Sequence, residues 1–304
     1  MKVRAILNPR AGVSREEARR AAERGHPRWD DFDLSVTEGP GHATELALAA
    51  AAAGADLVLS VGGDGTANEV ARGLLGSAAA LGIVPMGSGN GLARALRIPL
   101  RPARALHALD TGVRRLIDVG LLNGQPFLNV AGTGFDASVS RAFHDSGRAG
   151  GRRGLLGYVR LSLREMVRYR APRVVIETDT ERLELRPFVL TFANGPQYGS
   201  GAVINPGGKL DDGRLELVVL DDGPLLGLLA ASPRLFLGGL ERIAGYRRLR
   251  ATRVTVTAEE PLALHRDGDP GTATERIEVS IQPRALTIVA PAATASDPEG
   301  PFSN

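Results

Sequence analysis

The strongest constraint on the fold is a short apolar run that ends in a cluster of glycines. Residues 56–61 (Asp-Leu-Val-Leu-Ser-Val) are typical of a strand buried on both faces in a parallel sheet. Gly62, Gly63 and Gly65 surround Asp64 immediately afterwards, and a helix is predicted from Thr66 to about Leu75. The glycines permit positive φ and let backbone N–H groups approach a ligand closely. With the helix dipole behind it, this turn suits a phosphate group, and Asp64 is expected to act through a bound metal ion or a polar network.

Strands and helices alternate through the first 120 or so residues. Further strands are predicted at Lys2–Leu7, Phe32–Thr37 and Gly82–Pro85, with helices opening at Ser14 and His42 and a third ending at Leu96. This alternation predicts an open α/β layer whose ligands lie beyond the carboxyl ends of the strands. The first residues lack the long apolar core of a signal peptide, and we interpret them as a strand.

The sequence pattern changes after about Leu121. Short β-rich runs separated by turn residues dominate, as in a sandwich, with helix-like segments at about Leu155–Tyr169 and Leu225–Leu237. We therefore predict an α/β plus all-β chain. An N-terminal open α/β nucleotide-binding domain (1–121) is followed by a C-terminal β-sandwich domain (122–291), and then by a disordered tail rich in Pro, Ala and Ser (292–304).

Two further turns strengthen the expectation of a phosphate site. Gly87, Ser88, Gly89 and Asn90 also link a strand to a helix, in the same half of the chain. A third turn follows the first strand and contains Asn8, Pro9, Arg10, Ala11 and Gly12, where Asn8 can hydrogen-bond a nucleotide. Neighbouring strand ends of this kind can form one phosphate cradle between them.

Composition excludes several classes. Lys2 and Lys209 are the only lysines among 37 basic residues, so neither a Walker loop nor the strand lysine of a protein kinase is present. The chain has no cysteine, which removes disulfides, thiolate metal sites and cysteine nucleophiles. A net charge of +3 and 4% aromatic residues argue against nucleic acid as a partner.

One stretch suggests a membrane surface. Nine arginines lie between Arg141 and Arg173 against Asp145 and Glu165, a local net charge of +7. Arg160, Arg164 and Arg168 fall on one face of the expected helix, and a basic amphipathic helix can lie on anionic lipid. An ordinary solvated helix packed on its sandwich is the alternative. No apolar stretch reaches the length of a spanning helix, so we expect any membrane contact to be peripheral.

The motifs, taken in order, resemble the diacylglycerol-kinase catalytic family, which includes bacterial lipid kinases and sphingosine kinases. The resemblance covers essentially residues 1–290. Besides the three glycine turns it includes the following segments: 37–43 (Thr-Glu-Gly-Pro-Gly-His-Ala), 117–120 (Ile-Asp-Val-Gly), 129–136 (Asn-Val-Ala-Gly-Thr-Gly-Phe-Asp), 205–213 (Asn-Pro-Gly-Gly-Lys-Leu-Asp-Asp-Gly) and 267–269 (Asp-Gly-Asp).

This resemblance implies an ATP- and Mg²⁺-dependent kinase that phosphorylates a lipid hydroxyl, located in the cytoplasm at a membrane surface. A homodimer is compatible with it. The implied nucleotide-binding residues are Asn8, Pro9, Arg10, Ala11, Gly12, Thr37, Gly62, Gly63, Asp64, Gly65, Thr66, Asn68, Gly87, Ser88, Gly89 and Asn90. Asp64 would join a magnesium network with Asp118. Lys209, Asp212 and Arg214 would form a second, structural magnesium site, and Asp267 or Asp269 would be the catalytic base.

The chain departs from the family pattern at two positions. Gly91 stands where the family often has Asp, which is closer to sphingosine kinases, and Asp269 stands where Glu is usual. The lipid acceptor and the choice of base between Asp267 and Asp269 stay open.

Three other functions compete with this interpretation. NAD kinases share the Gly-Gly-Asp-Gly loop, so a kinase for a soluble substrate is the nearest alternative. A non-catalytic membrane-binding or regulatory protein is the second. Residues 132–137 (Gly-Thr-Gly-Phe-Asp-Ala) also match a dinucleotide-binding fingerprint, but no strand–helix–strand pattern follows them.

Overall fold

The computed structural model describes residues 1–11, 29, 31–148, 162, 164–166, 168–224, 227–228, 230 and 232–303, with residues 11 and 143–148 described by their backbone only. The helix expected from Ser14 and most of the helix expected at Leu155–Tyr169 lie outside this part, as does Gly12. Within it, no helix is both long enough and apolar enough to cross a bilayer.

The N-terminal half is an α/β layer in which every strand expected from the sequence is present. Its strands are β1 (Lys2–Leu7), β2 (Asp31–Val36), β3 (Leu57–Gly62) and β4 (Ala80–Pro85). They run parallel in the order β2-β1-β3-β4, and β3 and β4 are buried at every residue. The helices are η1 (Pro9–Ala11), α2 (His42–Ala52), α3 (Asp64–Leu74), α4 (Gly91–Ala95) and α5 (Pro102–Asp110).

The C-terminal half is rich in antiparallel strands. They are β5 (Val113–Leu122), β6 (Gln125–Phe127), β7 (Val130–Gly134), β8 (Val174–Thr178), β9 (Arg182–Leu185), β10 (Pro187–Ala193), β11 (Leu215–Asp221), β12 (Tyr246–Ala251), β13 (Arg253–Arg266) and β14 (Asp269–Ala290). The helices are α6 (Phe135–Arg148), η2 (Gly199–Gly201), α9 (Arg234–Leu237), η3 (Leu240–Arg242) and α10 (Ala292–Ala295). The predicted class, an α/β domain followed by a β-sandwich, is confirmed.

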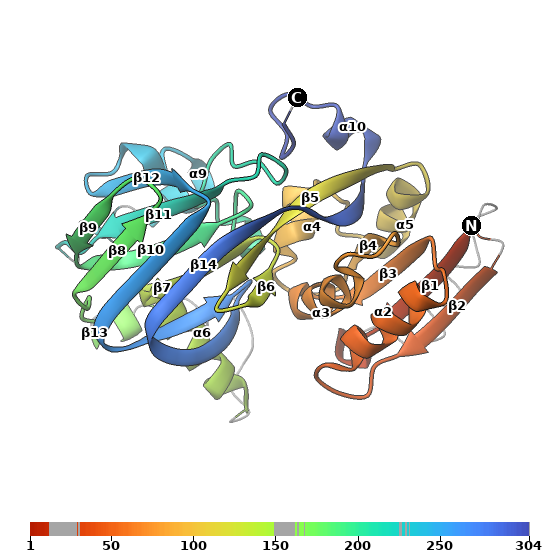
Figure 1. Cartoon of the computed structure of the whole chain (residues 1–304), viewed down its shortest axis with the longest axis horizontal. Helices are drawn as coiled ribbons and strands as arrows, with labels where there is room; N and C mark the ends of the chain where they lie inside the picture. The colour runs from red at the N-terminus through yellow and green to blue at the C-terminus, as the bar shows by residue number, and fades with distance from the viewer. Residues whose placement is uncertain are drawn as a thin grey trace.

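One long strand joins the two halves. β14 pairs with β13 over its first half and with β5 over its second half, and Ile288 near its end lies beside Leu81 of β4 in parallel register. Figure 1 shows β5 and β14 running from the β-rich half across to the α/β half. A single sheet of 14 strands therefore holds both halves together.

Three apolar clusters form the core. The largest fills the α/β half and also takes in Leu286, Ile288 and Val289 from β14. A second lies inside the β-rich half and includes Phe127, Phe192 and Leu217. A third, smaller cluster on the opposite face of β7, β10 and β11 contains Val130, Ala193, Ile204, Val218 and Leu240, and we call it the outer cluster.

The tail is ordered, and the expectation of disorder at residues 292–304 was wrong for all but residue 304, which lies outside the described part. Phe302 is 2% exposed in the α/β core, under the guanidinium of Arg115 at 4.8 Å from the ring centroid. Lys209 Nζ donates to the carbonyl groups of Pro298 and Gly300, at 3.1 and 2.6 Å. The prediction rested on composition, which does not show that one aromatic side chain and two backbone carbonyl groups fix the tail to the rest of the protein.

Candidate functional site

The two strand-end glycine turns touch each other. Met86 N–H donates to Gly62 O at 2.8 Å, and a Cβ built on Gly87 would lie 2.6 Å from the Cα of Gly63. Gly63 and Gly87 have no room for a side chain between them, because their backbones are already in contact. None of Gly62, Gly63, Gly65, Gly87 and Gly89 has positive φ, so the expected need for left-handed torsions was wrong, and close approach is the reason for these glycines.

Asp64 connects the first turn to the helix after the second. It is the first residue of α3, and its Oδ1 accepts the N–H of Gly91 at the start of α4, at 2.6 Å. Its Oδ2 faces Gly89, where a Cβ would come within 2.7 Å. Burial, and after it the nearby charge of Asp267, raise the pKa of Asp64 to about 6, against the opposing effect of the N–H groups at the start of α4. The carboxylate is thus partly removed from water and lies close to a second negative charge.

Gly91, the departure from the family pattern, has a steric explanation. A Cβ there would lie 2.9 Å from Asn129 Nδ2 and 3.2 Å from the backbone N of Gly199. Asn129 and the segment before η2 fill the space that an aspartate would need.

The third turn joins the same edge of the sheet. Asn8 Nδ2 donates to Thr66 Oγ1 on α3 at 3.0 Å, and Asn8 Oδ1 accepts the N–H of Arg10. Thr37 N–H donates to Leu7 O at 2.9 Å, which places Thr37 at the end of the neighbouring strand β2. The sequence-predicted nucleotide residues that are described therefore follow the ends of the four parallel strands β1, β2, β3 and β4, at one edge of the sheet. They are Asn8 to Ala11, Thr37, Gly62 to Thr66, Asn68 and Gly87 to Asn90.

The turn between β13 and β14 approaches this edge from the β-rich half. Asp267 has φ 47°, and its carboxylate accepts the backbone N–H groups of Leu128, Asn129 and Val130 at 2.7–2.9 Å. Asn68, one helical turn after Asp64, also hydrogen-bonds Asp267. Burial nevertheless raises the pKa of Asp267.

Asp269 has different surroundings. It is exposed, and its Oδ2 lies 3.2 Å from the position of a Cβ on Gly65. The structure thus brings Asp64, Asp267 and Asp269 together around the first glycine turn, although about 200 residues separate the first from the other two.

A buried polar network next to this turn was missed from the sequence. His265 is 2% exposed, and its Nε2 lies 2.9 Å from Asp136 Oδ2. The same oxygen accepts the hydroxyl of Tyr198 at 2.8 Å, and that hydroxyl also lies 2.5 Å from Thr191 Oγ1. Asp136 stands in the 129–136 motif and His265 two residues before Asp267, but only the pairing of β7 with β13 brings them together.

Asp118 does not lie with Asp64. Its carboxylate accepts the N–H groups of Gly213 and Arg284 at 2.6 and 2.7 Å, and the acidic neighbours that raise its pKa, after burial, are Asp212 and Asp211. The structure therefore places Asp118 with the 209–214 segment, whereas the charge beside Asp64 is that of Asp267.

The residues of the expected second metal site are adjacent but already partly engaged. Asp212 Oδ1 accepts the N–H of Arg214 at 3.0 Å, and Arg250 Nη2 lies 3.9 Å from Asp212 Oδ2. Among the described residues, no group of three or more acidic, His or Cys side chains is arranged to hold a metal ion. Magnesium at Lys209, Asp212 and Arg214, which would use two carbonyl groups and one carboxylate, stays a prediction.

The basic segment is described only in part. Arg141, Arg164, Arg168, Arg170 and Arg173 are exposed, the side chain of Arg148 is not described, and Arg152, Arg153 and Arg160 lie outside the described residues. Arg173 forms an ion pair with Glu184. Its contact with a membrane stays a prediction.

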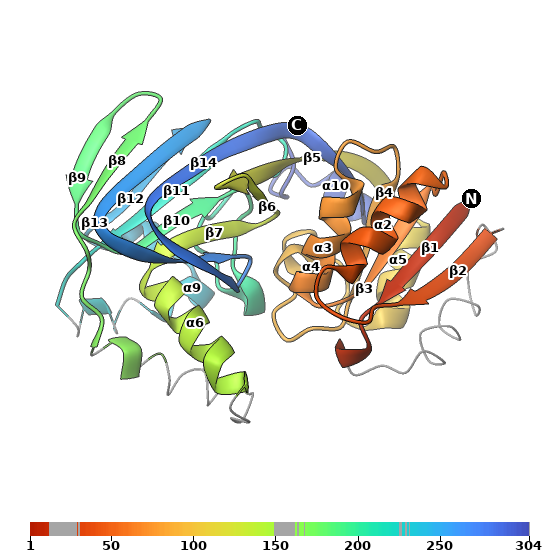
Figure 2. The same cartoon turned by 60° about the horizontal axis from the view of Figure 1, so that its bottom comes forward.

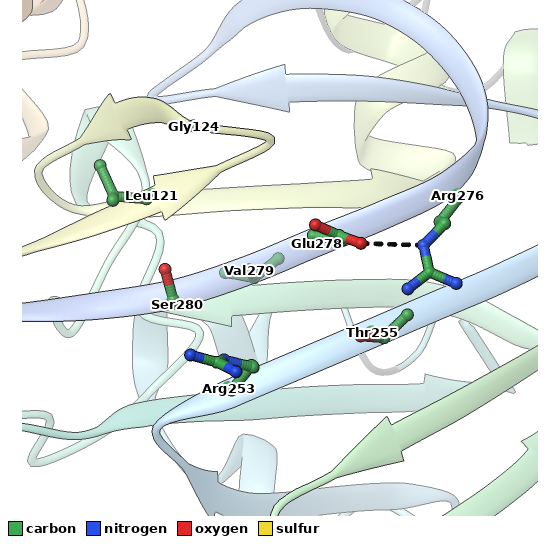
Figure 3. A pocket seen from close by; sticks show the side chains of 8 residues that line it. All are labelled: Leu121, Gly124, Arg253, Thr255, Arg276, Glu278, Val279 and Ser280. Carbon is green, nitrogen blue, oxygen red and sulfur yellow. Dashed lines mark hydrogen bonds and ion pairs between the residues drawn. The ribbon is translucent and has the colours of Figure 1, made fainter.

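A cavity of about 410 Å³ lies elsewhere (Figure 3). Arg253 and Thr255 of β13, Arg276 and Glu278 of β14, and residues of β5 and its turn line it. None of the site residues named above lines this cavity, and Arg276 and Glu278 pair with each other at 2.9 Å. We do not assign the phosphate chemistry to it.

Fold and site together define a two-domain protein with an NAD kinase-like fold, in which an α/β layer carries glycine turns and a β-sandwich brings acidic residues to them. Residues 2–122 match the diacylglycerol kinase catalytic domain family, and residues 129–290 match the YegS C-terminal NAD kinase beta sandwich-like domain family. The chain belongs to this family of lipid kinases.

Individual similar proteins support the assignment to this family. A probable lipid kinase YegS-like of Pseudomonas aeruginosa (strain UCBPP-PA14) is 34% identical over 284 residues, which cover 91% of this chain and 90% of that protein. A putative diacylglycerol kinase from Bacillus anthracis str. Sterne has a similar crystal structure, with a TM-score of 0.78, 24% identity and 96% of both chains covered. An NAD kinase from Archaeoglobus fulgidus shares the fold alone, with a TM-score of 0.50, 13% identity and coverage of 95% and 94%.

Proposed function

We propose that this protein transfers the γ-phosphate of ATP, with Mg²⁺, to the hydroxyl of a lipid such as a diacylglycerol or a sphingoid base. The observation that carries the proposal is the convergence of Asp64, Asp267 and Asp269 on the Gly63–Gly65 turn. Family membership supports phosphotransfer, and the Archaeoglobus fulgidus NAD kinase of the same fold was crystallised in complex with ATP.

The glycine turns would bind the phosphates through their backbone. Gly63 and Gly87 leave no side chain between the two turns, and the N-terminus of α3 adds its dipole. The hydrogen bond from Asn8 to Thr66 fixes the third turn against α3. Positioning and electrostatic stabilisation are the main contributions of a protein to phosphoryl transfer, so the shortage of lysine is no obstacle.

In the described part, no three acidic side chains are arranged around one ion. A magnesium ion would therefore take one or two carboxylates here, and its other oxygen ligands from the phosphates of ATP and from water. Asp64 and Asp267 repel each other when both are ionised, which contributes to the raised pKa of Asp64, and a bound cation would relieve that repulsion. Asp64 is the residue placed to hold it. When bound with ATP, magnesium would neutralise charge on the β- and γ-phosphates.

Two carboxylates are candidates for the base that accepts the proton of the lipid hydroxyl. Burial raises the pKa of Asp267, which is the direction that favours a general base, but backbone N–H groups already occupy its oxygens. Asp269 is exposed beside Gly65. General base catalysis typically contributes 10²–10⁴-fold, so loss of the true base lowers kcat by about that factor.

Transfer of labelled phosphate from ATP to a panel of acceptors tests the proposal. The panel contains diacylglycerol, monoacylglycerol, sphingosine, ceramide, phosphatidylglycerol and NAD, each with and without Mg²⁺. We expect at least one lipid to be labelled. The variants Asp64→Asn, Asp267→Asn and Asp269→Asn are then assayed on that lipid. Asp179→Asn, at the remote turn between β8 and β9, is the matched control and should retain full activity.

Labelling of NAD with no lipid labelled would replace the lipid acceptor by a soluble one. Full activity in both Asp267→Asn and Asp269→Asn would exclude this pair as the base. Because Asp267 also holds β7, unfolding must be measured for each variant before its kcat is interpreted.

A further inference from the structure

Two neighbouring apolar side chains in the β-rich half stand in solvent. Leu237 is 84% exposed and Phe236 is 61% exposed, whereas the other exposed large hydrophobic residues of the described part lie between 37% and 54%. Single exposed apolar residues are common on soluble proteins, but an adjacent Phe–Leu pair at a tip indicates a contact with another surface. We call Phe236 and Leu237 the apolar tip.

The local structure prevents this tip from folding back. α9 is a single turn, Arg234–Leu237, that starts after Pro233 and ends at Gly238 and Gly239, with φ of 85° and 81°. Leu235 O accepts the N–H of Val203 at 2.7 Å, and the Leu235 side chain packs on the outer cluster. Because Leu235 supplies the inward contact, the two residues after it are directed outward.

The surroundings of the tip are basic. Arg234 and Arg242 flank it and are exposed, and Glu241 is the one acidic residue in the 232–250 segment. Asp221 neutralises Arg247, and Glu216 neutralises Arg250. Arg234 Nη1 donates to Gly239 O at 3.3 Å, which leaves the other N–H groups of this guanidinium for an anionic partner. Among the described residues, neither Arg234 nor Arg242 forms an ion pair with a carboxylate.

The tip lies on the same side of the sheet as the buried polar network. Tyr198 packs against the outer cluster beneath α9, and its hydroxyl donates to Asp136 at the start of α6. Gly199, the next residue, lies against Gly89 of the second glycine turn, where a Cβ on Gly199 would be 3.0 Å from the Gly89 Cα. Figure 2 shows α6 and α9 on the same side of β7 and β10.

We propose that Phe236 and Leu237 insert into the interfacial region of a lipid bilayer, with Arg234 and Arg242 against anionic headgroups. An apolar tip with flanking arginines matches the layered polarity of such a surface, in which acyl chains lie below a negatively charged plane. The hydrogen bond from Val203 to Leu235 then connects the bilayer contact to the segment that packs on the nucleotide turns. The contact does not require phosphotransfer, so it can be tested separately from the proposed function.

Vesicle sedimentation measures the contact. The wild type and Phe236→Ser/Leu237→Ser are compared on vesicles of phosphatidylcholine with and without 30% phosphatidylglycerol, and Leu48→Ser is the control because Leu48 is 54% exposed on α2 in the other half. Insertion removes apolar surface of both side chains from water, which strengthens binding, and serine at these positions loses that contribution. We expect the double variant to bind about tenfold more weakly, and Leu48→Ser to bind as the wild type.

Fluorescence gives a second readout that does not depend on the double variant being folded. Trp29 is the only native tryptophan and is 9% exposed, so Phe236→Trp adds an exposed reporter to a constant background. We expect a blue shift of the Phe236→Trp emission on phosphatidylglycerol vesicles, together with quenching by brominated lipid.

The proposal is refuted if the emission of Phe236→Trp does not shift at lipid concentrations that sediment the wild type. It is also refuted if the double variant binds vesicles as tightly as the wild type, or if Leu48→Ser loses as much affinity as the double variant. If the emission of Phe236→Trp instead shifts to the blue as the protein concentration rises, with no vesicles present, the partner of the apolar tip is a second copy of the chain. Vesicle binding without phosphate transfer would refute the proposed function and leave this contact intact.

Discussion

Replacement of Asp64 by Asn should make the ligand-free protein more stable while it removes phosphotransfer. The pKa of Asp64 is raised from 3.8 to about 6, chiefly by burial and then by Asp267. At 1.36 kcal/mol per unit of pKa, ionisation of this carboxyl at pH 7 costs the folded state about 3 kcal/mol. Seating the amide group against Gly89 should cost about 1 kcal/mol, which leaves a net gain of about 2 kcal/mol.

The pH dependence gives the prediction its sign. A carboxyl whose pKa is raised on folding binds its proton more tightly in the folded state, so its ionisation destabilises the protein at neutral pH. This penalty shrinks as the pH falls through 6 and nearly vanishes at 3.8, because the carboxyl is then largely protonated in the folded state. The penalty should therefore fall from about 3 kcal/mol at pH 7 to about 1.6 kcal/mol at pH 5, and the net advantage of Asp64→Asn by about two-thirds.

Urea unfolding followed by the emission of Trp29 measures this effect in the α/β half, to whose core Trp29 belongs. Asp179→Asn is the control of opposite sign, because the hydrogen bonds of Thr252 lower the pKa of Asp179 and its loss should destabilise the protein at pH 7. If Asp64→Asn proved less stable than the wild type at pH 7, or if its advantage were independent of pH, the electrostatic account of this site would be refuted.

Three further substitutions probe the site and the tail. Gly91→Asp places a side chain where none fits and a second charge beside Asp64, so it should raise the KM for ATP at least tenfold in steady-state kinetics; an unchanged KM would contradict the steric account. Phe302→Ala should destabilise the protein by about 3–5 kcal/mol in urea unfolding, whereas a disordered tail would give no change. Asn68→Ala removes a hydrogen bond that lowers the pKa of Asp267, so the acidic limb of the kcat profile should move to higher pH; a profile that stays in place would exclude Asp267 as the base.

Much of the α/β half could be predicted from local pattern. The apolar run at 56–61 and the glycines after it specify a buried strand and a tight turn, and the structure has both. The 135–148 helix, by contrast, was not predicted, and the pattern of short β-rich runs after Leu121 did not indicate that residues 269–290 form the single long strand β14. Strand ends depend on pairing partners such as β5, which the sequence pattern does not specify.

The sequence by itself determined which residues could bind phosphate. Glycines at strand ends, Asp64 between them and the ordered motifs are local features, because backbone crowding and turn geometry act over a few residues. Only the tertiary structure decided which distant residues meet. It paired Asp64 with Asp267 rather than Asp118 and buried Phe302 in the first domain, because β14 crosses between the halves. It also joined His265 to Asp136, because β7 pairs with β13.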